Sequence, residues 1–216
     1  MARLSLAMLR REYFGKPLLE EYLGDDPFEL FDAWFEDAAR EIKDDPNAMI
    51  LSTSGKEGQP SSRTVLLKGY TREGFVFFTN YQSRKGKQIS FNPRVSLLFY
   101  WPGLVRQVIV EGVAEKIAEE ESETYFKSRP AGSQISAIAS PQSDVVDSRA
   151  ELEERARFIE QQTSESEIKR PAHWGGYLVR PHRIEFWQGR INRLHDRICY
   201  QRKGDEKKWK RVRLAP

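Results

Sequence analysis

Two neighbouring stretches of the sequence decide the fold class: Ser61-Ser-Arg-Thr-Val-Leu-Leu-Lys-Gly-Tyr70 and Gly74-Phe-Val-Phe-Phe-Thr-Asn80. Both are short and rich in β-branched and aromatic residues, which is typical of β-strands. A similar run precedes them at 49–54 and others follow at 94–100 and 106–118, and glycine or proline stands in the breaks between the runs. Strands this close together favour antiparallel pairing in a barrel or sandwich over alternating β-α-β units.

Helical patterns lie before, between and after these strands. Asp26 can cap a helix that starts at Pro27, with an apolar stripe of Phe28, Phe31, Phe35, Ala38 and Ile42. Further helices are expected at 83–91, 119–128, 133–139 and after Ser148, whose capping partner is Glu151, and strands return at 176–179, 183–187, 196–202 and 208–214. The sequence thus predicts a mainly β chain with helices (α+β). We expect one domain over 26–216, with helices inserted at about 119–162.

Composition limits the classes of partner. The 216 residues contain 35 Lys and Arg against 32 Asp and Glu, and a net charge of +3 is too weak to indicate nucleic-acid binding. Cys199 is the only cysteine, so no intramolecular disulfide can form, and we expect a small buried apolar residue there. No apolar stretch is long enough to span a membrane, and residues 1–9 lack the cleavage pattern of a signal peptide. We therefore expect a cytoplasmic protein with no nucleic-acid or membrane partner.

The sequence lacks the motifs of several enzyme classes. The sequence has no P-loop, no G-x-G-x-x-G fingerprint after a strand and no G-x-S-x-G elbow. His173, His182 and His195 are scattered, so we expect no metal site. If the protein is an enzyme, an organic cofactor must supply the difficult chemistry.

Cationic side chains stand inside or beside the apolar runs. Arg63 and Lys68 flank Val-Leu-Leu, and a buried charge without a partner is costly, so both indicate bound anions. Strict alternation would place them on opposite faces, unless a bulge intervenes; alternatively, both project from strand ends into water. Ser83, Arg84 and Lys85 open a predicted helix and can form a phosphate site, although taken alone the pattern favours a Ser-capped surface helix with solvated basic residues.

The sequence resembles the pyridoxine (pyridoxamine) 5'-phosphate oxidase family in motifs that run in the family's order over nearly the whole chain. These are Leu9-Arg-Arg-Glu-Tyr13, Arg63-Thr-Val-Leu-Leu-Lys68, Phe78-Thr-Asn80, Ser83-Arg-Lys85, Asn92-Pro-Arg-Val-Ser-Leu-Leu-Phe99, Arg106-Gln107-Val108, Ser128-Arg-Pro130, Trp174-Gly-Gly176, Ile184-Glu-Phe-Trp-Gln-Gly189, Arg193-Leu-His-Asp-Arg197 and Arg213-Leu-Ala-Pro216.

The resemblance implies an antiparallel, FMN-binding split β-barrel that forms homodimers, with two FMN sites at the subunit interface. It implies an oxidase that converts pyridoxamine 5'-phosphate and pyridoxine 5'-phosphate to pyridoxal 5'-phosphate while oxygen is reduced to hydrogen peroxide. This reaction belongs to vitamin B6 metabolism, in the biosynthesis and salvage of pyridoxal phosphate.

The resemblance also assigns residues by position. For FMN it implies Arg63, Lys68, Phe78, Thr79, Arg84, Lys85, Gln107, Gln142, Ser143, Trp187 and Arg197, with Arg63, Arg84 and Lys85 on the phosphate. For the substrate it implies Lys68, Tyr125, Arg129 and Ser133 at the phosphate, and Arg193 and His195, the expected catalytic residues, at the pyridine ring. Arg10 and Tyr13 fall in an N-terminal segment, residues 1–25, that can close over the site. Phe78 departs from the family, which often has Tyr there, and this puts a side-chain hydroxyl role in doubt.

Spacing adds two geometric expectations. Tyr125 and Arg129 are four residues apart and would share a helix face, and Arg193 and His195 would project to the same side of an extended segment. Alternatively, Arg193 and His195 are exposed turn residues that pair with Asp196. Trp174 and Trp187 are more often core or interface aromatics than ligand contacts.

Two rival functions remain at this point. One is a split-barrel carrier of flavin or a haem-like ligand without turnover, which would not need the second cationic set or the pair Arg193 and His195. The other is a nucleic-acid-binding barrel that uses the basic stretch 207–213, and salt-dependent DNA binding without a yellow colour would reveal it.

Overall fold

The computed structural model describes residues 12–162, 168–202, 206 and 208–216. The chain forms two compact units: unit 1 comprises Met1–Met49, Leu97–Glu111 and His182–Pro216, and unit 2 comprises Ile50–Ser96 and Gly112–Pro181. The expectation of one domain over residues 26–216 stays a prediction. No helix in the described ranges is long and apolar enough to cross a membrane. Arg10 lies outside the described residues.

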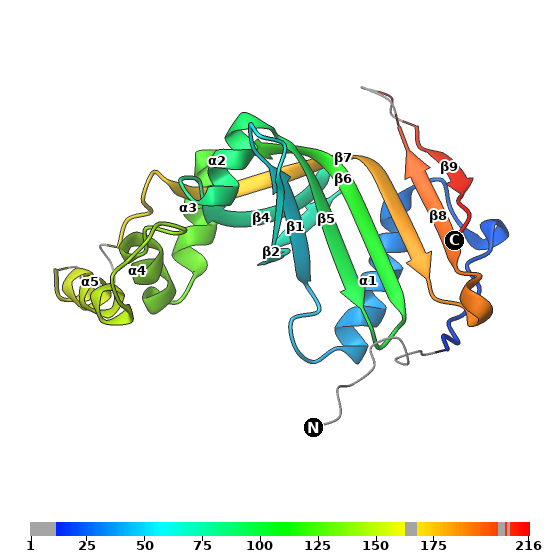
Figure 1. The fold of residues 1–216 in the computed structure, drawn as a ribbon, viewed down its shortest axis with the longest axis horizontal. Helices are drawn as coiled ribbons and strands as arrows, with labels where there is room; N and C mark the ends of the chain where they lie inside the picture. The colour runs from blue at the N-terminus through cyan, green and yellow to red at the C-terminus, as the bar shows by residue number, and fades with distance from the viewer. Residues whose placement is uncertain (1–11, 163–167, 203–205, 207) are drawn as a thin grey trace. The chain divides into compact units, whose positions relative to one another are not determined.

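A nine-stranded sheet forms the framework, in the order β2-β1-β5-β6-β7-β4-β3, with β8 pairing with β7 and β9 (Figure 1). Its strands are β1 (Ala48–Ser54), β2 (Pro60–Leu66), β3 (Gly69–Thr71), β4 (Gly74–Asn80), β5 (Arg94–Trp101), β6 (Arg106–Lys116), β7 (Trp174–Gln188), β8 (Asp196–Gln201) and β9 (Lys210–Arg213). The pairs β3–β4, β4–β7, β7–β8 and β8–β9 are antiparallel. The expected α+β class with antiparallel pairing is confirmed.

In unit 1, helix α1 (Pro27–Glu41) packs against the strands (Figure 1). Asp26 caps it as expected, since its side chain accepts a hydrogen bond from Phe28 N. Phe28 and Phe31 of its apolar stripe are buried, and the Trp34 ring meets Phe186 of β7 edge-on at 5.3 Å. The same unit holds the 3-10 turns η2 (Glu20–Tyr22) and η4 (Ile191–Arg193).

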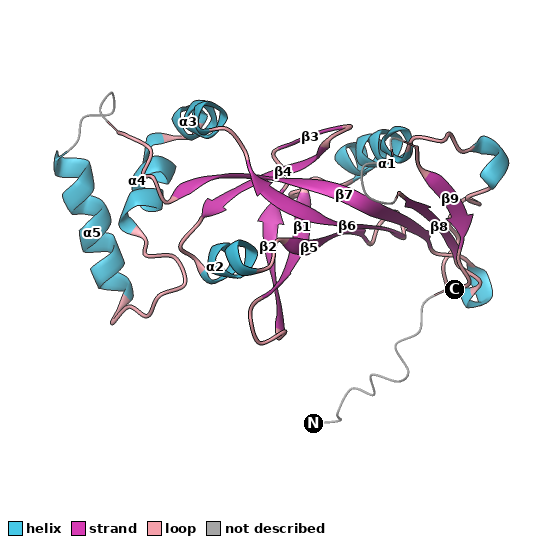
Figure 2. Cartoon of the chain, turned by 90° about the horizontal axis from the view of Figure 1, so that it is seen from above, coloured by secondary structure: helices cyan, strands magenta, loops and turns pink. Residues whose placement is uncertain are grey.

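Unit 2 contains the remaining helices: α2 (Arg84–Phe91), α3 (Glu119–Ser128), α4 (Ala131–Ala139) and α5 (Arg149–Gln162). Figure 2 shows α4 and α5 lying next to each other. A small apolar cluster of Phe126, Ile135, Ile168 and Trp174 anchors α3 and α4 to the start of β7. At α5, Ser148 Oγ accepts a hydrogen bond from Glu151 N, which confirms the expected cap.

The strand boundaries differ from the expectation at two places. The run 61–70 divides into β2 and β3, whereas the runs 176–179 and 183–187 form one strand, β7, that passes through the buried Pro181. Proline lacks an amide donor but has extended backbone angles, so a strand can continue through it where no partner needs that donor.

Candidate functional site

A cavity of about 900 Å³ lies in unit 2. It is lined by every site residue expected in this unit except Arg84: Arg63, Lys68, Phe78, Thr79, Lys85, Tyr125, Arg129, Ser133, Gln142 and Ser143. The rest of its wall is Thr64, Val65, Leu66, Asn80, Pro130, Ser136, Ala137, Ser140 and Trp174. Residues that are far apart in the sequence therefore converge on one concave site.

The charged residues that line this cavity are all cations: Arg63, Lys68, Lys85 and Arg129. No aspartate or glutamate is among the described residues that line it. Like charges gathered in a partly buried site repel one another and lose hydration, which is costly without a counter-ion. The cavity is therefore built to receive anions.

Arg63 is held by neutral acceptors. Its Nη1 donates to the Leu51 carbonyl oxygen at 3.1 Å and to Thr53 Oγ1 at 2.6 Å, and its Nη2 donates to Ser61 Oγ at 2.7 Å. Burial lowers the pKa of the Arg63 guanidinium, and the nearby charge of Arg84 lowers that pKa further. These hydrogen bonds orient the guanidinium and leave its charge uncompensated.

Lys68 shares the cavity with Arg63, although strict alternation would separate them. Strand β2 ends at Leu66, so the alternation of faces does not extend to Lys68. The expectation that Arg63 and Lys68 serve two different anions stays a prediction.

Lys85 is placed by the first turn of α2. The buried Ser83 caps this helix, since Ser83 Oγ accepts from Gly86 N and donates to the Asn80 carbonyl oxygen. Gly86 lets the turn lie against the backbone of Tyr81, because a Cβ there would clash with the Tyr81 carbonyl oxygen. The Lys85 side chain thereby becomes buried, and burial together with the charge of Arg63 lowers the pKa of its ammonium.

Gln142 connects two other expected site residues. Its Oε1 accepts hydrogen bonds from Lys85 Nζ at 3.1 Å and from Thr79 Oγ1 at 3.2 Å. A neutral amide oxygen orients the ammonium without neutralising it. The loop that contains Gln142 and Ser143 thus closes one side of the cavity.

Arg84 points elsewhere. It is exposed and lines a second cavity of unit 2, of about 470 Å³, together with Lys56 and Lys87. Ser143 lines both cavities, so the two adjoin. The role of Arg84 at a cofactor phosphate stays a prediction.

The large cavity is also lined by Tyr125, Arg129 and Ser133. The expected shared helix face of Tyr125 and Arg129 does not account for this. Helix α3 ends at Ser128, and Arg129 has extended backbone angles (φ −78°, ψ 149°), so a shared helix face is the wrong explanation for Tyr125 and Arg129. The break turns the chain into α4, which carries Ser133.

Arg129 has an unusual environment. Its Nη1 is buried and makes no hydrogen bond to any residue that the structure describes. Its guanidinium carbon lies 4.6 Å from the centroid of the Trp174 ring, and burial lowers the pKa of the side chain. An orphaned buried donor beside an acid-free cavity indicates a place for a ligand oxygen.

Phe78 contributes an apolar ring. This ring is half-buried and stacks on Tyr125 with centroids 3.9 Å apart and planes at 21°. A tyrosine hydroxyl is not needed for this stacking, which explains why phenylalanine is acceptable at position 78.

The expected site residues of unit 1 form a second group. The rings of Tyr13, Trp187 and His195 contact one another, with centroids 4.7 Å apart for Trp187 and His195, 5.8 Å for Tyr13 and His195, and 6.0 Å for Tyr13 and Trp187. Gln107 lies half-buried on β6 of the same unit.

His195 has a defined tautomer. Its Nδ1 accepts a hydrogen bond from Arg190 N at 3.0 Å, so a neutral ring carries its proton on Nε2. Burial lowers the pKa of His195 and the charge of Arg193 lowers it further, against an opposing effect of Asp196, and this favours the neutral ring. Neutral His195 is therefore a hydrogen-bond donor through Nε2.

The turn before His195 is not extended. Asn192 and Arg193 have left-handed backbone angles (φ 54° and 58°), which asparagine adopts readily but which are uncommon for arginine. The expectation of an extended segment is wrong here, because η4 intervenes. Within the part of the chain that the structure describes, the ion pairs of Asp196 are with Arg213 at 2.7 Å and with Arg190 at 3.6 Å.

Arg197 is held by a buried acid. Trp187 and Arg197 are direct partners across β7 and β8. Arg197 Nε donates to Glu185 Oε1 at 2.7 Å, and Arg183 Nη2 donates to Glu185 Oε2 at 2.6 Å. Burial raises the pKa of Glu185, but the hydrogen bonds from both arginines outweigh this effect and hold that pKa below its usual value.

Sequence reasoning did not assign site roles to Trp174 or Glu185. Trp174 was expected in a core or interface; it is indeed buried, but it also lines the cavity. Glu185 carried a usable signal, since a lone acid inside the apolar run Ile184-Glu-Phe-Trp187 must have a cationic partner. Cys199 is buried, as expected.

Comparison with known families agrees with this geometry. Residues 35–163 match the family model described as pyridoxamine 5'-phosphate oxidase, and residues 174–216 match the pyridoxine 5'-phosphate oxidase C-terminal dimerisation region. A pyridoxine/pyridoxamine 5'-phosphate oxidase of Rubrobacter xylanophilus is 54% identical over 215 residues, which cover 100% of this chain and 98% of that protein. The protein of the same name from Salinibacter ruber is 52% identical and covers 98% of this chain and 99% of its own.

Solved structures show the same fold. PhzG of Burkholderia lata, solved with tetrahydrophenazine-1-carboxylic acid, has a TM-score of 0.85 at 29% identity and covers 94% of this chain and 99% of its own. An FMN-binding protein of Nostoc punctiforme related to pyridoxamine 5'-phosphate oxidase has a TM-score of 0.71 at 16% identity, covering 90% of this chain and 100% of its own. The likeness confirms the expected split-barrel fold. By its family match and its full-length relatives, the chain belongs to the pyridoxamine 5'-phosphate oxidase family.

Proposed function

We propose that this chain is an FMN-dependent oxidase that converts pyridoxamine 5'-phosphate and pyridoxine 5'-phosphate to pyridoxal 5'-phosphate and reduces oxygen to hydrogen peroxide. The observation that carries the proposal is the cavity of unit 2, whose charged lining residues are all cations. Full-length relatives that are 54% and 52% identical to this chain are named for this activity.

The cavity fits a flavin phosphate together with a phosphorylated substrate. Its volume of about 900 Å³ lies in the upper range of small-molecule sites. Four cations without a carboxylate suit two phosphate groups, each close to a double negative charge at neutral pH. The orphaned Arg129 Nη1 provides a donor that a phosphate oxygen would satisfy.

We divide the cations into two sets. Arg63 and Lys85, with Thr79, Gln142 and Ser143 beside them, hold the FMN phosphate end, and Arg84 adds charge from the adjoining cavity. Lys68, Tyr125, Arg129 and Ser133 hold the substrate phosphate. Phe78, Gln107, Trp187 and Arg197 complete the flavin site in this proposal.

Bound FMN would accept two electrons from the substrate carbon that carries the amine or hydroxyl and pass them to oxygen. The residues of the chain orient that carbon and exclude water. Neutral His195 donates a hydrogen bond from Nε2 to a substituent of the pyridine ring, and Arg193 covers the ring from its left-handed turn. Tyr13, in contact with His195 and Trp187, lies in the segment that closes over the bound substrate together with Arg10.

We further propose a homodimer with its FMN sites at the subunit interface. The dimerisation region at 174–216 contains Trp187, Arg193, His195 and Arg197, which supports this placement. We also propose that the protein acts in the cytoplasm, where its single buried thiol, Cys199, would stay reduced.

Steady-state turnover tests the proposed function. The purified protein should contain FMN, and each of the two phosphorylated substrates should give pyridoxal 5'-phosphate and hydrogen peroxide in equal amounts. FMN-loaded protein that forms no aldehyde from either substrate would refute the assignment and favour a flavin carrier.

A further inference from the structure

Trp174 belongs both to the apolar core of unit 2 and to the wall of the large cavity. It opens β7, its side chain is buried, and it lines the large cavity of unit 2. Its ring stacks on Phe78 at 5.5 Å between centroids, with planes at 15°, and meets Phe126 edge-on at 5.2 Å. The ring is therefore fixed by its neighbours.

The backbone of Trp174 is fixed as well. Its carbonyl oxygen accepts a hydrogen bond from Arg170 Nη1 at 2.6 Å, and Arg170 Nε donates to Glu123 on α3 at 3.2 Å. Trp174 is also the register partner of Asn80 at the end of β4. A ring that is anchored at both backbone and side chain can hold a neighbouring group in one position.

That neighbouring group is the Arg129 guanidinium, 4.6 Å from the ring centroid. The Arg129 backbone is fixed too, because its carbonyl oxygen accepts from Gln134 Nε2 at 2.8 Å. The side chain, however, has no carboxylate partner among the residues that line the cavity, and its Nη1 is buried without a hydrogen bond in the described structure.

The choice of partner decides what Arg129 can do. A carboxylate would orient the guanidinium, but it would also neutralise its charge and occupy the donors that a phosphate needs. An aromatic face attracts the cation through the ring quadrupole and leaves the N–H groups free. Trp174 thus orients Arg129 without competing with an anionic ligand.

We propose that Trp174 is a positioning residue for the substrate phosphate: it holds the Arg129 guanidinium in the orientation that receives the phosphate ester. This inference rests on the proposed function, because it takes the phosphate to be that of the B6 substrate. Trp174 acts through Arg129 and takes no part in electron transfer.

An inert pair of ligands isolates this effect. 4-Deoxypyridoxine 5'-phosphate and 4-deoxypyridoxine differ only in the phosphate, and neither has the hydroxyl that is oxidised. Isothermal titration calorimetry of the FMN-loaded enzyme with each ligand gives the phosphate preference as the ratio of the two dissociation constants. Trp174→Leu should lower this preference about tenfold, equivalent to about 1.4 kcal/mol, and Trp174→Phe about threefold, since the smaller ring attracts the cation less.

Trp34→Leu is the matched control. Trp34 is buried and has the Arg106 guanidinium carbon 4.7 Å from its ring centroid, but it belongs to unit 1 and does not line the cavity. This variant loses the same kind of contact and should keep the wild-type phosphate preference.

An unchanged phosphate preference in Trp174→Leu would overturn the proposal. If the affinities for both ligands fell by the same factor, the preference would also be unchanged, and Trp174 would then act on cavity shape alone. If Trp174→Leu does not fold, Trp174→Phe decides, and a wild-type preference in that variant overturns the proposal. The proposed function can fail separately: a wild-type protein that prefers the phosphate ester yet oxidises neither substrate would refute the activity and leave the role of Trp174 standing.

Discussion

Replacing Lys85 by methionine should weaken FMN binding while it relieves the apoprotein of a costly charge. Lys85 is buried, and among the described residues its ammonium has the neutral partners Gln142 and Ser83 and its cavity has no acidic lining residue. A charge-assisted hydrogen bond to phosphate contributes about 1.5–3 kcal/mol. The dissociation constant of FMN should therefore rise about 10- to 150-fold in Lys85→Met.

The same substitution should stabilise the apoprotein. Burial and the charge of Arg63 lower the pKa of Lys85, so the folded state binds this proton less tightly than the unfolded state does. The charged ammonium consequently destabilises the folded apoprotein at neutral pH, and the cost declines only as the pH rises through the lowered pKa. Each 1 kcal/mol gained should raise the apoprotein Tm by about 2–4 °C.

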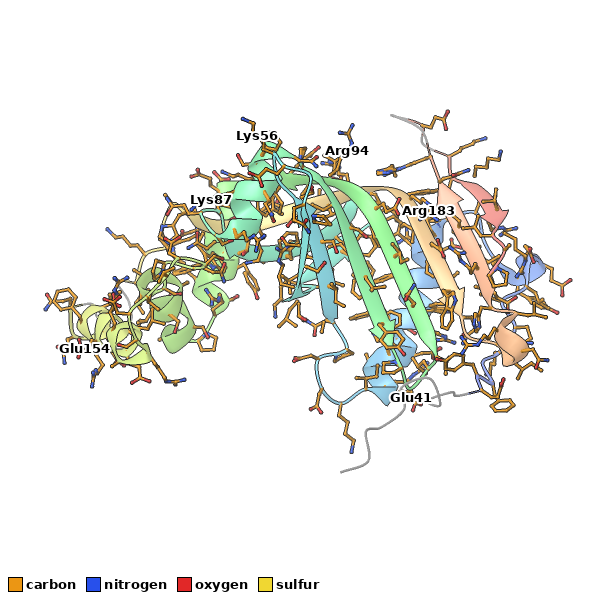
Figure 3. All side chains as sticks on the ribbon, in the orientation of Figure 1. Glu41, Lys56, Lys87, Arg94, Glu154 and Arg183 are labelled. Carbon is orange, nitrogen blue, oxygen red and sulfur yellow. The ribbon has the colours of Figure 1, made fainter. Side chains whose placement is uncertain are left out.

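Titration of the apoprotein with FMN at constant ionic strength, followed by flavin fluorescence, measures the first effect, and thermal denaturation measures the second. Lys87→Met is the control: Lys87 lies on the same helix (Figure 3), but its side chain is 66% exposed. Its removal should change the FMN dissociation constant less than about twofold, as expected for a screened surface charge. Wild-type FMN affinity in Lys85→Met, or an equal loss in both variants, would refute the assignment of Lys85 to the flavin phosphate.

Three further predictions concern the remaining groups. Arg129→Ala should raise KM for pyridoxamine 5'-phosphate about tenfold or more, with a smaller effect on kcat; an unchanged KM means that the substrate phosphate binds elsewhere. Arg193→Ala and His195→Ala should retain FMN but lose about tenfold or more in kcat/KM, and wild-type flavin reduction rates in stopped-flow experiments would remove both from the site. Glu185→Gln should release Arg197 and lower both FMN content and Tm at pH 7. Because the pKa of Glu185 is lowered in the folded state, the stability that this carboxylate contributes is present above its usual pKa of 4.5 and is lost as the pH falls below that value. The Tm of Glu185→Gln should therefore change less with pH in this acid range than the Tm of the wild type, and an equal change of Tm with pH in both proteins would contradict this prediction.

Local patterns were sufficient to predict most of the elements. Asp26 and Pro27 start α1, and the run of aromatic and β-branched residues at Gly74–Asn80 is β4, because capping and residue preference depend on neighbours in the sequence. The division of 61–70 and the fusion at Pro181 could not be predicted, since both depend on which strand lies alongside.

The site was predictable in composition but not in geometry. Cations beside apolar runs indicated anions, and Arg63 and Lys85 do line an acid-free cavity. The left-handed turn at Arg193 and the break of α3 before Arg129 result from tertiary constraints that spacing cannot reveal. Trp174 is buried as expected, but its place beside Arg129 could not be predicted, because a buried aromatic residue has the same sequence pattern whether it packs only in the core or also lies against a cation.

Anaerobic mixing of the FMN-loaded protein with pyridoxamine 5'-phosphate tests the central claim most directly. The visible absorption of oxidised flavin should disappear, with one pyridoxal 5'-phosphate formed for each flavin, and admission of oxygen should restore the absorption and give hydrogen peroxide. Unphosphorylated pyridoxamine at the same concentration should act far more slowly, because the cations of the cavity have no phosphate to bind. Flavin absorption that persists with the phosphorylated substrate, or disappears equally fast with both compounds, would contradict the account.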